Sequence, residues 1–261
     1  MKQILAAAAI SVLLTAPAIS ADLRMPAKAP AMMAAAPPAY YNWSGFYIGA
    51  NAGYSWNRTD IDYYFPDPTF LNSRRHNGDS FIGGGQIGYN WQTGPIVFGI
   101  EIDAAWRGGG EGSTFAFANG IDFTDFNTDH HFLATFRPRL GFAANNFLFY
   151  VTGGAALGGV EHSYTERRPS VAGASRTIVL DDSRWGWTAG GGIEAGFGQW
   201  SVGLEYLYVD LGDETIAAPA AVLGGVAFPP SAVTFDDRSH ILRAKLNYRF
   251  GGGAAPVMAR Y

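Results

Sequence analysis

The sequence contains no cysteine, little charge and no long hydrophobic run. The absence of Cys from 261 residues excludes a disulfide framework, a cysteine-ligated zinc site and thiol catalysis. Charged residues make up 15% of the chain, below the roughly 25% of an average soluble domain. With a formal net charge of −4 and no basic run, the chain is not expected to bind nucleic acid. No stretch offers the roughly 18 continuous apolar residues of a membrane helix, so helical spans are not expected.

The N-terminal region has the pattern of a secretory signal peptide. Lys2 supplies a positive charge, a short apolar core follows it, and small residues then suit cleavage after Ser20 or Ala21. We therefore predict a signal peptide over residues 1–21 and export of the chain. Residues 22–41 are rich in Ala and Pro, which predicts an extended linker.

From residue 42 onward the dominant pattern is a two-residue alternation, which is the signal of β-strands. Between Ile96 and Trp106, for example, every second residue is apolar, whereas the residues between them include Gly99, Glu101 and Asp103. Eight segments alternate in this way: 46–56, 81–91, 96–106, 131–142, 147–158, 184–197, 201–208 and 242–250.

The connections between these segments also alternate, in length. Tight turns of Gly, Pro, Asn and Gln are predicted at 92–95, 144–146 and 198–199. The other connections are long polar segments, predicted as loops at about 57–79, 108–129, 161–182 and 210–237. Short connections on one side, long ones on the other and an even strand number are typical of an outer-membrane barrel.

Alternation alone does not show which face of the barrel is apolar, because a soluble barrel of the same strand number points its apolar side inward. The second set of residues is mostly Gly with a few charges, which suits the crowded interior of a narrow barrel. The apolar set then faces lipid. Tryptophans near both strand ends predict two aromatic belts: Trp43, Trp91 and Trp200 at the short turns, and Trp56, Trp106, Trp185 and Trp187 at the long connections.

The prediction is therefore an all-β protein with an eight-stranded antiparallel up-and-down transmembrane β-barrel over residues 42–250 and a short tail over 251–261. We expect it in the cell outer membrane as a monomer, in contact with outer-membrane lipid and lipopolysaccharide.

Two motifs stand at the ends of the barrel region. They are Asn42-Trp43-Ser44-Gly45-Phe46-Tyr47-Ile48-Gly49 and Leu246-Asn247-Tyr248-Arg249-Phe250-Gly251-Gly252. In both, the chain resembles the small "porin family" outer-membrane barrels of alphaproteobacteria, the surface antigens of rhizobia, brucellae and bartonellae, some of which bind haemin. The resemblance implies a barrel similar to the OmpA transmembrane domain. The peptidoglycan-binding role of OmpA-type proteins is not implied, because no such domain is expected here.

The last strand is expected to carry the signal read by the barrel-assembly machinery, with Tyr248 and Phe250 as its aromatic residues. Either Phe250 or Tyr261 is then read as the terminus.

Charged residues on the predicted inner face form a candidate site. Buried charges need partners, and Glu101, Arg139, Glu205 and Lys245 lie at about the same height above the short turns. We predict one ionic layer inside the barrel, either a structural plug or a gate for a small ion path. Its members are Glu101, Asp103, Arg137, Arg139, Glu194, Glu205, Arg243 and Lys245.

The histidines form a second candidate site, because all five fall in the long connections or at their rims. They are His76, His130, His131, His162 and His240. Imidazole ligates haem iron, so haemin is a candidate ligand, although polar residues are also expected in solvated loops. No cofactor is otherwise predicted.

Neither catalysis nor a metal site is predicted. Ser239 and His240 lie near the rim, but adjacent strand residues point to opposite faces, so no catalytic triad emerges and no enzyme is predicted. Acidic residues of the long connections are candidates to bind divalent cations that bridge lipopolysaccharide, or else form a solvated rim. They are Asp60, Asp62, Asp67, Asp210, Asp213, Glu214, Asp236 and Asp237.

The function predicted from these patterns is structural: a barrel that maintains envelope integrity and displays surface loops. The alternatives are a surface haemin-binding receptor and, third, a small diffusion pore.

Overall fold

The computed structural model describes residues 41–64, 71–108, 110–116, 123–169 and 174–250. The chain divides into units of residues 1–37 and 38–261, and every described residue belongs to the second. The predicted signal peptide, the linker up to residue 40 and the tail over 251–261 lie outside the described residues. No helix in the described ranges is long and apolar enough to cross a membrane.

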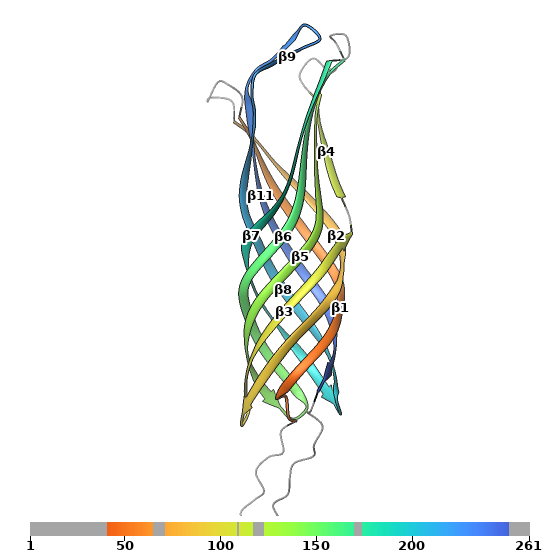
Figure 1. The fold of residues 1–261 in the computed structure, drawn as a ribbon, viewed down its shortest axis with the longest axis vertical. Helices are drawn as coiled ribbons and strands as arrows, with labels where there is room; N and C mark the ends of the chain where they lie inside the picture. The colour runs from red at the N-terminus through yellow and green to blue at the C-terminus, as the bar shows by residue number, and fades with distance from the viewer. Residues whose placement is uncertain (1–40, 65–70, 109, 117–122, 170–173, 251–261) are drawn as a thin grey trace, which may run out of the picture. The chain divides into compact units, whose positions relative to one another are not determined.

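The second unit is built from antiparallel strands, as the two-residue alternation predicts. Eight strands follow one another round the sheet in the order β3-β2-β1-β11-β8-β7-β6-β5, and the pairing of β3 with β5 closes the ring (Figure 1). The predicted all-β, eight-stranded fold is confirmed. Its strands are β1 (Gly45–Tyr64), β2 (Leu71–Thr93), β3 (Ile96–Gly108), β5 (Phe123–Ala144), β6 (Phe147–Arg168), β7 (Ala174–Phe197), β8 (Trp200–Ala218) and β11 (Ser231–Arg249).

Three shorter strands lie outside the ring. β4 (Gly110–Ala116) pairs with β5, and β9 (Ala221–Leu223) forms a hairpin with β10 (Val226–Phe228). The ring is continuous only as far as Gly108, which faces Phe81 of β2. Beyond it, Leu71–Ser80 of β2 pairs with β1 and β4 pairs with β5, and no pairing of described residues joins β2 to β4.

The three tight turns lie where they were predicted. Each begins with a residue in the left-handed region: Gly94 with φ 58°, Asn145 with φ 54° and Gly198 with φ 60°. Glycine adopts this conformation freely and asparagine tolerates it better than most residues, so these positions end one strand and begin the next.

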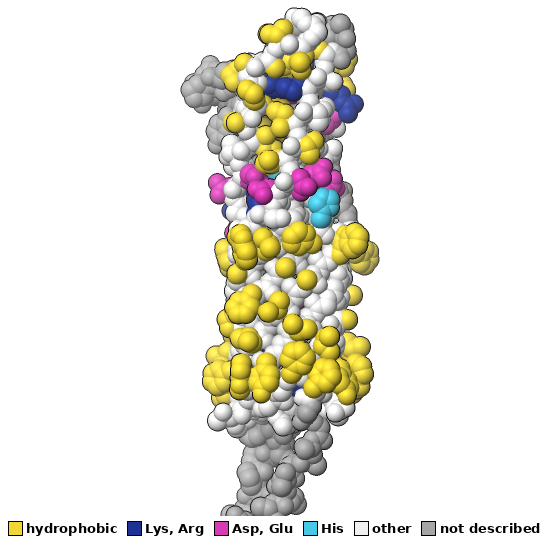
Figure 2. All heavy atoms as spheres, viewed as in Figure 1, with side chains coloured by type: hydrophobic (Ala, Val, Ile, Leu, Met, Phe, Trp, Pro, Cys, Tyr) yellow, Lys and Arg dark blue, Asp and Glu magenta, His cyan; other side chains and the backbone are white. Residues whose placement is uncertain are grey.

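The outer wall of the ring is apolar over a band bounded by two belts. In β3, for example, buried and exposed residues alternate along almost the whole strand. Figure 2 shows both belts as rings of hydrophobic side chains on the visible face. Exposed residues of the lower belt, at the short turns, include Phe46, Trp91, Phe142, Phe197 and Trp200; those of the upper belt include Trp56, Phe81, Trp106, Phe132, Trp185 and Trp187.

Trp43 does not join the lower belt, so its predicted place on the outer wall is wrong. Its side chain is 1% exposed and packs inside the barrel mouth against Val97 and Leu148. The residues before β1 turn into this mouth: the Trp43 amide donates to Oε1 of Gln92 at 2.6 Å, and the Arg249 guanidinium lies 5.2 Å from the Trp43 ring centre.

The long connections are mostly strand, not loop, and this corrects a second prediction. β1 continues to Tyr64 and β6 continues to Arg168. β5 already begins at Phe123 and β7 at Ala174. We call the strand portions beyond the upper belt the outer extension: residues 57–64, 71–80, 110–116, 123–131, 161–168, 174–184, 210–218 and 231–239.

The outer extension has its own apolar core, which explains why these segments form strands. Its buried cluster points inward and consists of Ile61, Phe126, Tyr164, Ile216, Ala218, Val233 and Phe235. Across the upper belt the outward-facing set thus changes from apolar to mostly polar, while the inward-facing set retains an apolar core. A wall surrounded by water requires such a polar outer face over an apolar core, as in a soluble barrel.

Candidate functional site

The structure places all eight residues of the predicted ionic layer in one network inside the barrel. Glu101 and Asp103 come from β3, Arg137 and Arg139 from β5, and the remaining four from β7, β8 and β11. Residues two apart on one strand share a face, so each such pair points inward together. None of the eight is more than 5% exposed.

Glu101 accepts from several strands at once. Its carboxylate lies 2.7 Å from Nζ of Lys245 and 2.7 Å from Nη2 of Arg137. The Tyr47 hydroxyl donates to Glu101 at 2.6 Å. A weaker contact of 3.6 Å joins Glu101 to Arg139. A buried carboxylate with this many donors keeps its charge without water.

Glu205 is held in the same way from the opposite side. It lies 2.7 Å from Nη2 of Arg243, 3.3 Å from Nη1 of Arg137 and 3.3 Å from Nζ of Lys245. The Tyr150 hydroxyl donates to Glu205 at 2.9 Å. Arg137, Arg243 and Lys245 therefore bridge Glu205 to the carboxylates of β3.

The remaining two carboxylates complete the network. Asp103 lies 2.9 Å from Nη1 of Arg243 and 2.8 Å from Nη2 of Arg137. Glu194 lies 2.9 Å from Nη1 of Arg139 and accepts from Ser201 at 3.1 Å. The layer contains four carboxylates and four cations, so its formal charge is zero.

Glycines on the inner face make room for this network. A Cβ at Gly88 would overlap the Tyr47 hydroxyl, and one at Gly192 would come within 2.7 Å of the Tyr150 hydroxyl. Because both tyrosines donate to the layer, the small residues that distinguish the inner face are needed for close packing.

Apolar residues close the interior on both sides of the ionic layer. Toward the short turns lie Trp43, Val97, Ala143, Leu148 and Tyr150. Toward the upper belt lie Ile82, Ala105, Leu133, Ala156, Val160, Leu207, Val209, Leu211 and Ile241. Side chains thus fill the interior through the membrane band.

A second buried polar cluster, not predicted from the sequence, lies in the outer extension. Asp237 pairs with Arg184, accepts from the Thr59 hydroxyl at 2.8 Å and lies 3.3 Å from Nε2 of His162. The continued alternation of 231–240 was the signal that could have revealed Asp237 as an inward-facing residue.

The five histidines do not form one site. His130 and His162 are buried inside the barrel, whereas His131 and His240 are exposed on its outer wall. His76 lies in β2, and its side chain is outside the described set. A β-bulge between His130 and Phe132 shifts the register of β5, so His131 faces outward although the alternation placed it in the lumen. His130 and His162 both lie near Asp237, and haemin binding stays a prediction.

The adjacent residues Ser239 and His240 point to opposite faces, as predicted. The Ser239 hydroxyl is inside the barrel, 2.9 Å from Oδ1 of Asn57, while His240 contacts the Tyr206 hydroxyl at 2.6 Å on the outer wall. They therefore do not act together on one substrate.

An acidic band lies directly above the upper belt on the face shown in Figure 2. Of the acidic residues named from the sequence, Asp60 lies 3.0 Å from Arg75, and Asp236 lies 2.6 Å from Arg238. Asp237 is buried, and Asp67 lies outside the described residues. Within the described ranges, no group of three or more His, Asp or Glu side chains is placed to hold a metal ion.

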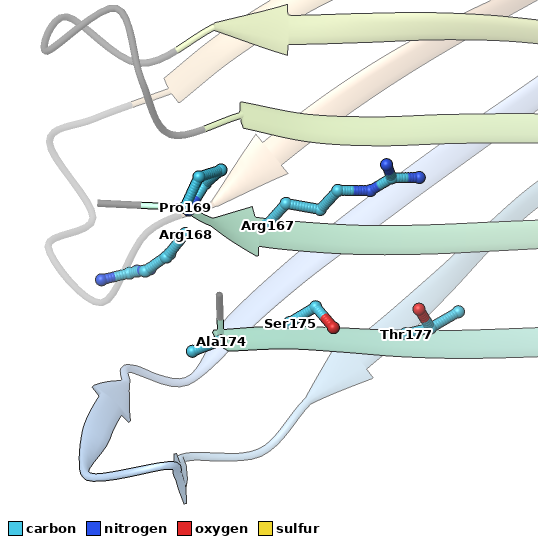
Figure 3. Close-up of a pocket in the computed structure, with 6 residues that line it drawn as sticks. All are labelled: Arg167, Arg168, Pro169, Ala174, Ser175 and Thr177. Atoms are coloured by element: carbon cyan, nitrogen blue, oxygen red, sulfur yellow. The ribbon is translucent and has the colours of Figure 1, made fainter. Parts of the chain in front are cut away.

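One surface pocket, of about 360 Å³, lies at the tip of the outer extension. It is lined by Arg167, Arg168, Pro169, Ala174, Ser175 and Thr177 (Figure 3). In the close-up the two arginine side chains point away from each other. Arg168 instead lies over the Phe228 ring, 4.9 Å from its centre, so the pocket has no convergent polar groups.

The two aromatic residues of the predicted assembly signal lie at the lower belt. The rings of Tyr248 and Phe250 are 5.1 Å apart, and Phe250 also packs 5.6 Å from Phe46. Their contacts close the ring at the short-turn end, and their role as an assembly signal stays a prediction.

Burial sets the protonation of two groups in the outer extension, beyond the membrane band. Burial, and then the charge of Arg107, lower the pKa of His130 to about 3. Burial acts to raise the pKa of Asp237, but the hydrogen bond from His162 and nearby cations overcome it and hold the pKa at about 2. Both groups therefore bind fewer protons in the folded state than in the unfolded one.

Acid should loosen the outer extension before the membrane band. Because unfolded His has a pKa of about 6.5, folding stability falls as the pH drops from about 6.5 toward 3. Asp237 adds a further loss as the pH falls through about 2. We expect amide hydrogen exchange in 123–131 to accelerate across the first window while exchange in 147–157 stays slow.

A matched pair of variants tests the cause of this acid loosening. His130→Asn should move its onset to lower pH, whereas His131→Asn, at an exposed position, should leave the profile unchanged. Identical profiles for the two variants would refute the role of His130.

A closed ring of eight strands, with an apolar wall between two aromatic belts and a polar, filled interior, defines a transmembrane β-barrel of the outer-membrane type. Short turns of such barrels face the periplasm, so the outer extension faces the exterior.

Comparison with known proteins agrees with this class. Residues 27–250 match the model of the family described as "Outer membrane protein beta-barrel domain". The chain belongs to this family, and it is a protein of the cell outer membrane. The resemblance at its two terminal motifs is thereby confirmed.

The relatives are outer-membrane proteins of alphaproteobacteria. The chain is 33% identical over 251 residues to the 31 kDa outer-membrane immunogenic protein of Brucella melitensis, which covers 93% of this chain and 98% of that protein. It is 31% identical over 172 residues to a 22 kDa outer membrane protein of Rhizobium leguminosarum bv. viciae, covering 65% and 64%. Among solved structures, OprG from Pseudomonas aeruginosa aligns at 11% identity with a TM-score of 0.44, covering 79% of this chain and 97% of that one.

Proposed function

We propose that this protein is a structural barrel that maintains the integrity of the outer membrane and displays its outer extension to the surroundings. The observation that carries the proposal is the filled interior. A neutral ionic layer with contacts among five strands lies between two apolar clusters, and no member of it is more than 5% exposed.

The same observation argues against a diffusion pore. An ion path needs water along the axis, yet Tyr47, Tyr150 and Arg137 occupy the centre of the barrel and each donates to or pairs with a buried carboxylate. Opening a path would separate these buried pairs, which is costly in a low-dielectric interior.

The relatives support the display of a surface. The Brucella proteins of 31 and 25 kDa are named immunogenic, which indicates that some part of those proteins is accessible to a host. In this chain, the outer extension and the hairpin of β9 and β10 are the parts beyond the upper belt that suit such a role. The Brucella and Rhizobium relatives are named as immunogenic or outer membrane proteins, which supports a non-enzymatic role.

The test is a deletion strain challenged with bile salts and with a large antibiotic that the intact outer membrane excludes. We expect the deletion to lower the inhibitory concentrations severalfold and the wild-type gene to restore them. A variant lacking the hairpin residues 220–229 should restore them equally, because that hairpin lies outside the ring.

A deletion strain as resistant as its parent would refute the envelope role. Restoration only by chains that keep the hairpin would point to a receptor. A stable ohmic conductance of the purified barrel in planar bilayers would point to a pore.

A further inference from the structure

Arg107 is a buried cation for which the described residues provide no counter-ion. It is the penultimate residue of β3, directly above the pair formed by Trp106 and Phe132 in the upper belt, and its side chain points inside. It is 2% exposed. Its Nη1 donates to the Ser239 hydroxyl at 3.2 Å, while Nε and Nη2 have no hydrogen-bond partner among the described residues.

Among the described residues, no carboxylate forms an ion pair with Arg107. The apolar cluster containing Leu133, Leu207 and Ile241 lies between it and the ionic layer. On its own side of that cluster, Asp237 attracts Arg107 but is already engaged by Arg184, Thr59 and His162. Glu214 pairs with Arg184 at 3.3 Å. A buried charge without a partner is strongly destabilising, and a persistent one in a native structure indicates a bound ion or ordered water.

The free atoms of Arg107 indicate which kind of partner fits. Nε–H and Nη2–H lie on one edge of the planar guanidinium and point the same way, and this edge is the fork that binds carboxylate and phosphate with two parallel hydrogen bonds. A single water or halide occupies only part of such a fork.

Further unpartnered polar atoms lie near Arg107. His130, on the neighbouring strand β5, is 5% exposed and its Nδ1 has no hydrogen-bond partner. Nε of Arg184 is also unpartnered, although its Nη2 pairs with Asp237. These atoms come from three strands and sit directly above the membrane band.

The ring is incomplete beside Arg107. Strand pairing between β2 and β3 ends at Gly108, the next residue, and no pairing of described residues joins β2 to β4 beyond it. Arg107 therefore lies where the β2–β3 pairing ends, next to the upper belt, at the level expected for the lipid headgroups of the outer leaflet, many of which carry phosphate.

We propose that the buried polar cluster of Arg107, His130 and Arg184 binds a phosphate-type oxyanion, with the Nε–Nη2 edge of Arg107 as its principal donor. The phosphate comes either from solution or from a lipid headgroup. This site is independent of the structural role proposed above, because none of its residues belongs to the ionic layer.

The experiment uses the full chain refolded in detergent free of lipopolysaccharide. Inorganic phosphate is titrated at constant ionic strength, with chloride replaced by phosphate. The thermal unfolding midpoint is measured from the change in electrophoretic mobility that heating causes in the folded barrel. We expect phosphate to raise the unfolding midpoint of the wild type saturably. This rise should be lost in Arg107→Lys, which keeps the positive charge but not the two parallel N–H donors. Arg238→Lys is the matched control, because Arg238 is exposed on the outer wall.

A second titration, with lipid A in mixed micelles, shows whether the phosphate comes from a lipid headgroup or from solution. A saturable, Arg107-dependent rise with lipid A alone assigns the phosphate to a headgroup, and one with inorganic phosphate assigns it to solution; both support the site. The absence of any Arg107-dependent rise in either titration overturns the proposal.

A crystallographic experiment tests the site without requiring any variant to fold. Wild-type crystals soaked in arsenate, a phosphate isostere, should show an anomalous peak within hydrogen-bond distance of Nε and Nη2 of Arg107. Only water density there would equally overturn the proposal.

Discussion

Replacing Glu205 with alanine is expected to lower the free energy of unfolding by about 3–5 kcal/mol, because it leaves buried cations without their counter-charge. Arg243, Arg137 and Lys245 all lie within 3.3 Å of the Glu205 carboxylate, and each is at most 2% exposed. The measurement is reversible unfolding in denaturant of the barrel refolded into lipid vesicles.

Two further variants establish that the effect comes from the buried network. Glu161→Ala removes a carboxylate that is 37% exposed and whose ion-pair partner among the described residues is His131, so a change of less than about 1 kcal/mol is expected. The double variant Glu205→Leu with Lys245→Met removes one charge of each sign and should recover part of the loss. Equal midpoints for Glu205→Ala and Glu161→Ala would contradict the network.

Replacing Leu204 with arginine is expected to destabilise the barrel by about 2–4 kcal/mol, because the charge would enter hydrocarbon near the middle of the membrane. Leu204 is 55% exposed on the outer wall of β8, between Trp200 of the lower belt and the upper belt. Unfolding in lipid vesicles measures this effect directly.

A leucine outside the band provides the control. Leu223 in β9 is 40% exposed but belongs to the hairpin beyond the ring, so Leu223→Arg should leave the unfolding free energy unchanged. If Leu204→Arg were equally harmless, the apolar outer wall would not face lipid.

The predictions from the sequence were most accurate where the two-residue alternation was unbroken. The strands, the three turns and the inward-facing charges all followed from it, because a strand must point successive side chains to opposite faces. The prediction failed at His131, where β5 contains a β-bulge. A single inserted residue shifts the side chains that follow to the other face and leaves no clear mark in the sequence.

The outer extension was mispredicted for a different reason. Its residues alternate as regularly as those below the upper belt, but in β1 Ile61 faces inward whereas Ile48 faces outward. A search for one continuous apolar face interprets such a reversal as the end of the strand. The segments were therefore predicted as loops, although the structure forms strands over most of them.

Trp43 was misplaced for a related reason. Tryptophan near a strand end is favoured at a membrane interface, but it is equally suited to closing a barrel mouth beside a cation such as Arg249. Which of these occurs depends on the direction taken by the residues before β1.

The sequence by itself determined the class of protein, the strand number, the apolar outer wall and the residues that carry charge into the interior. These features depend on local alternation and on turn residues, which neighbouring positions reveal. Only the tertiary structure decided which charges meet. Arg243 and Asp103 are 140 positions apart and come together because ring closure and strand register bring β11 opposite β3 across a narrow interior. The same closure places an apolar cluster between Arg107 and the ionic layer, which contains Glu101 and Asp103 of the same strand.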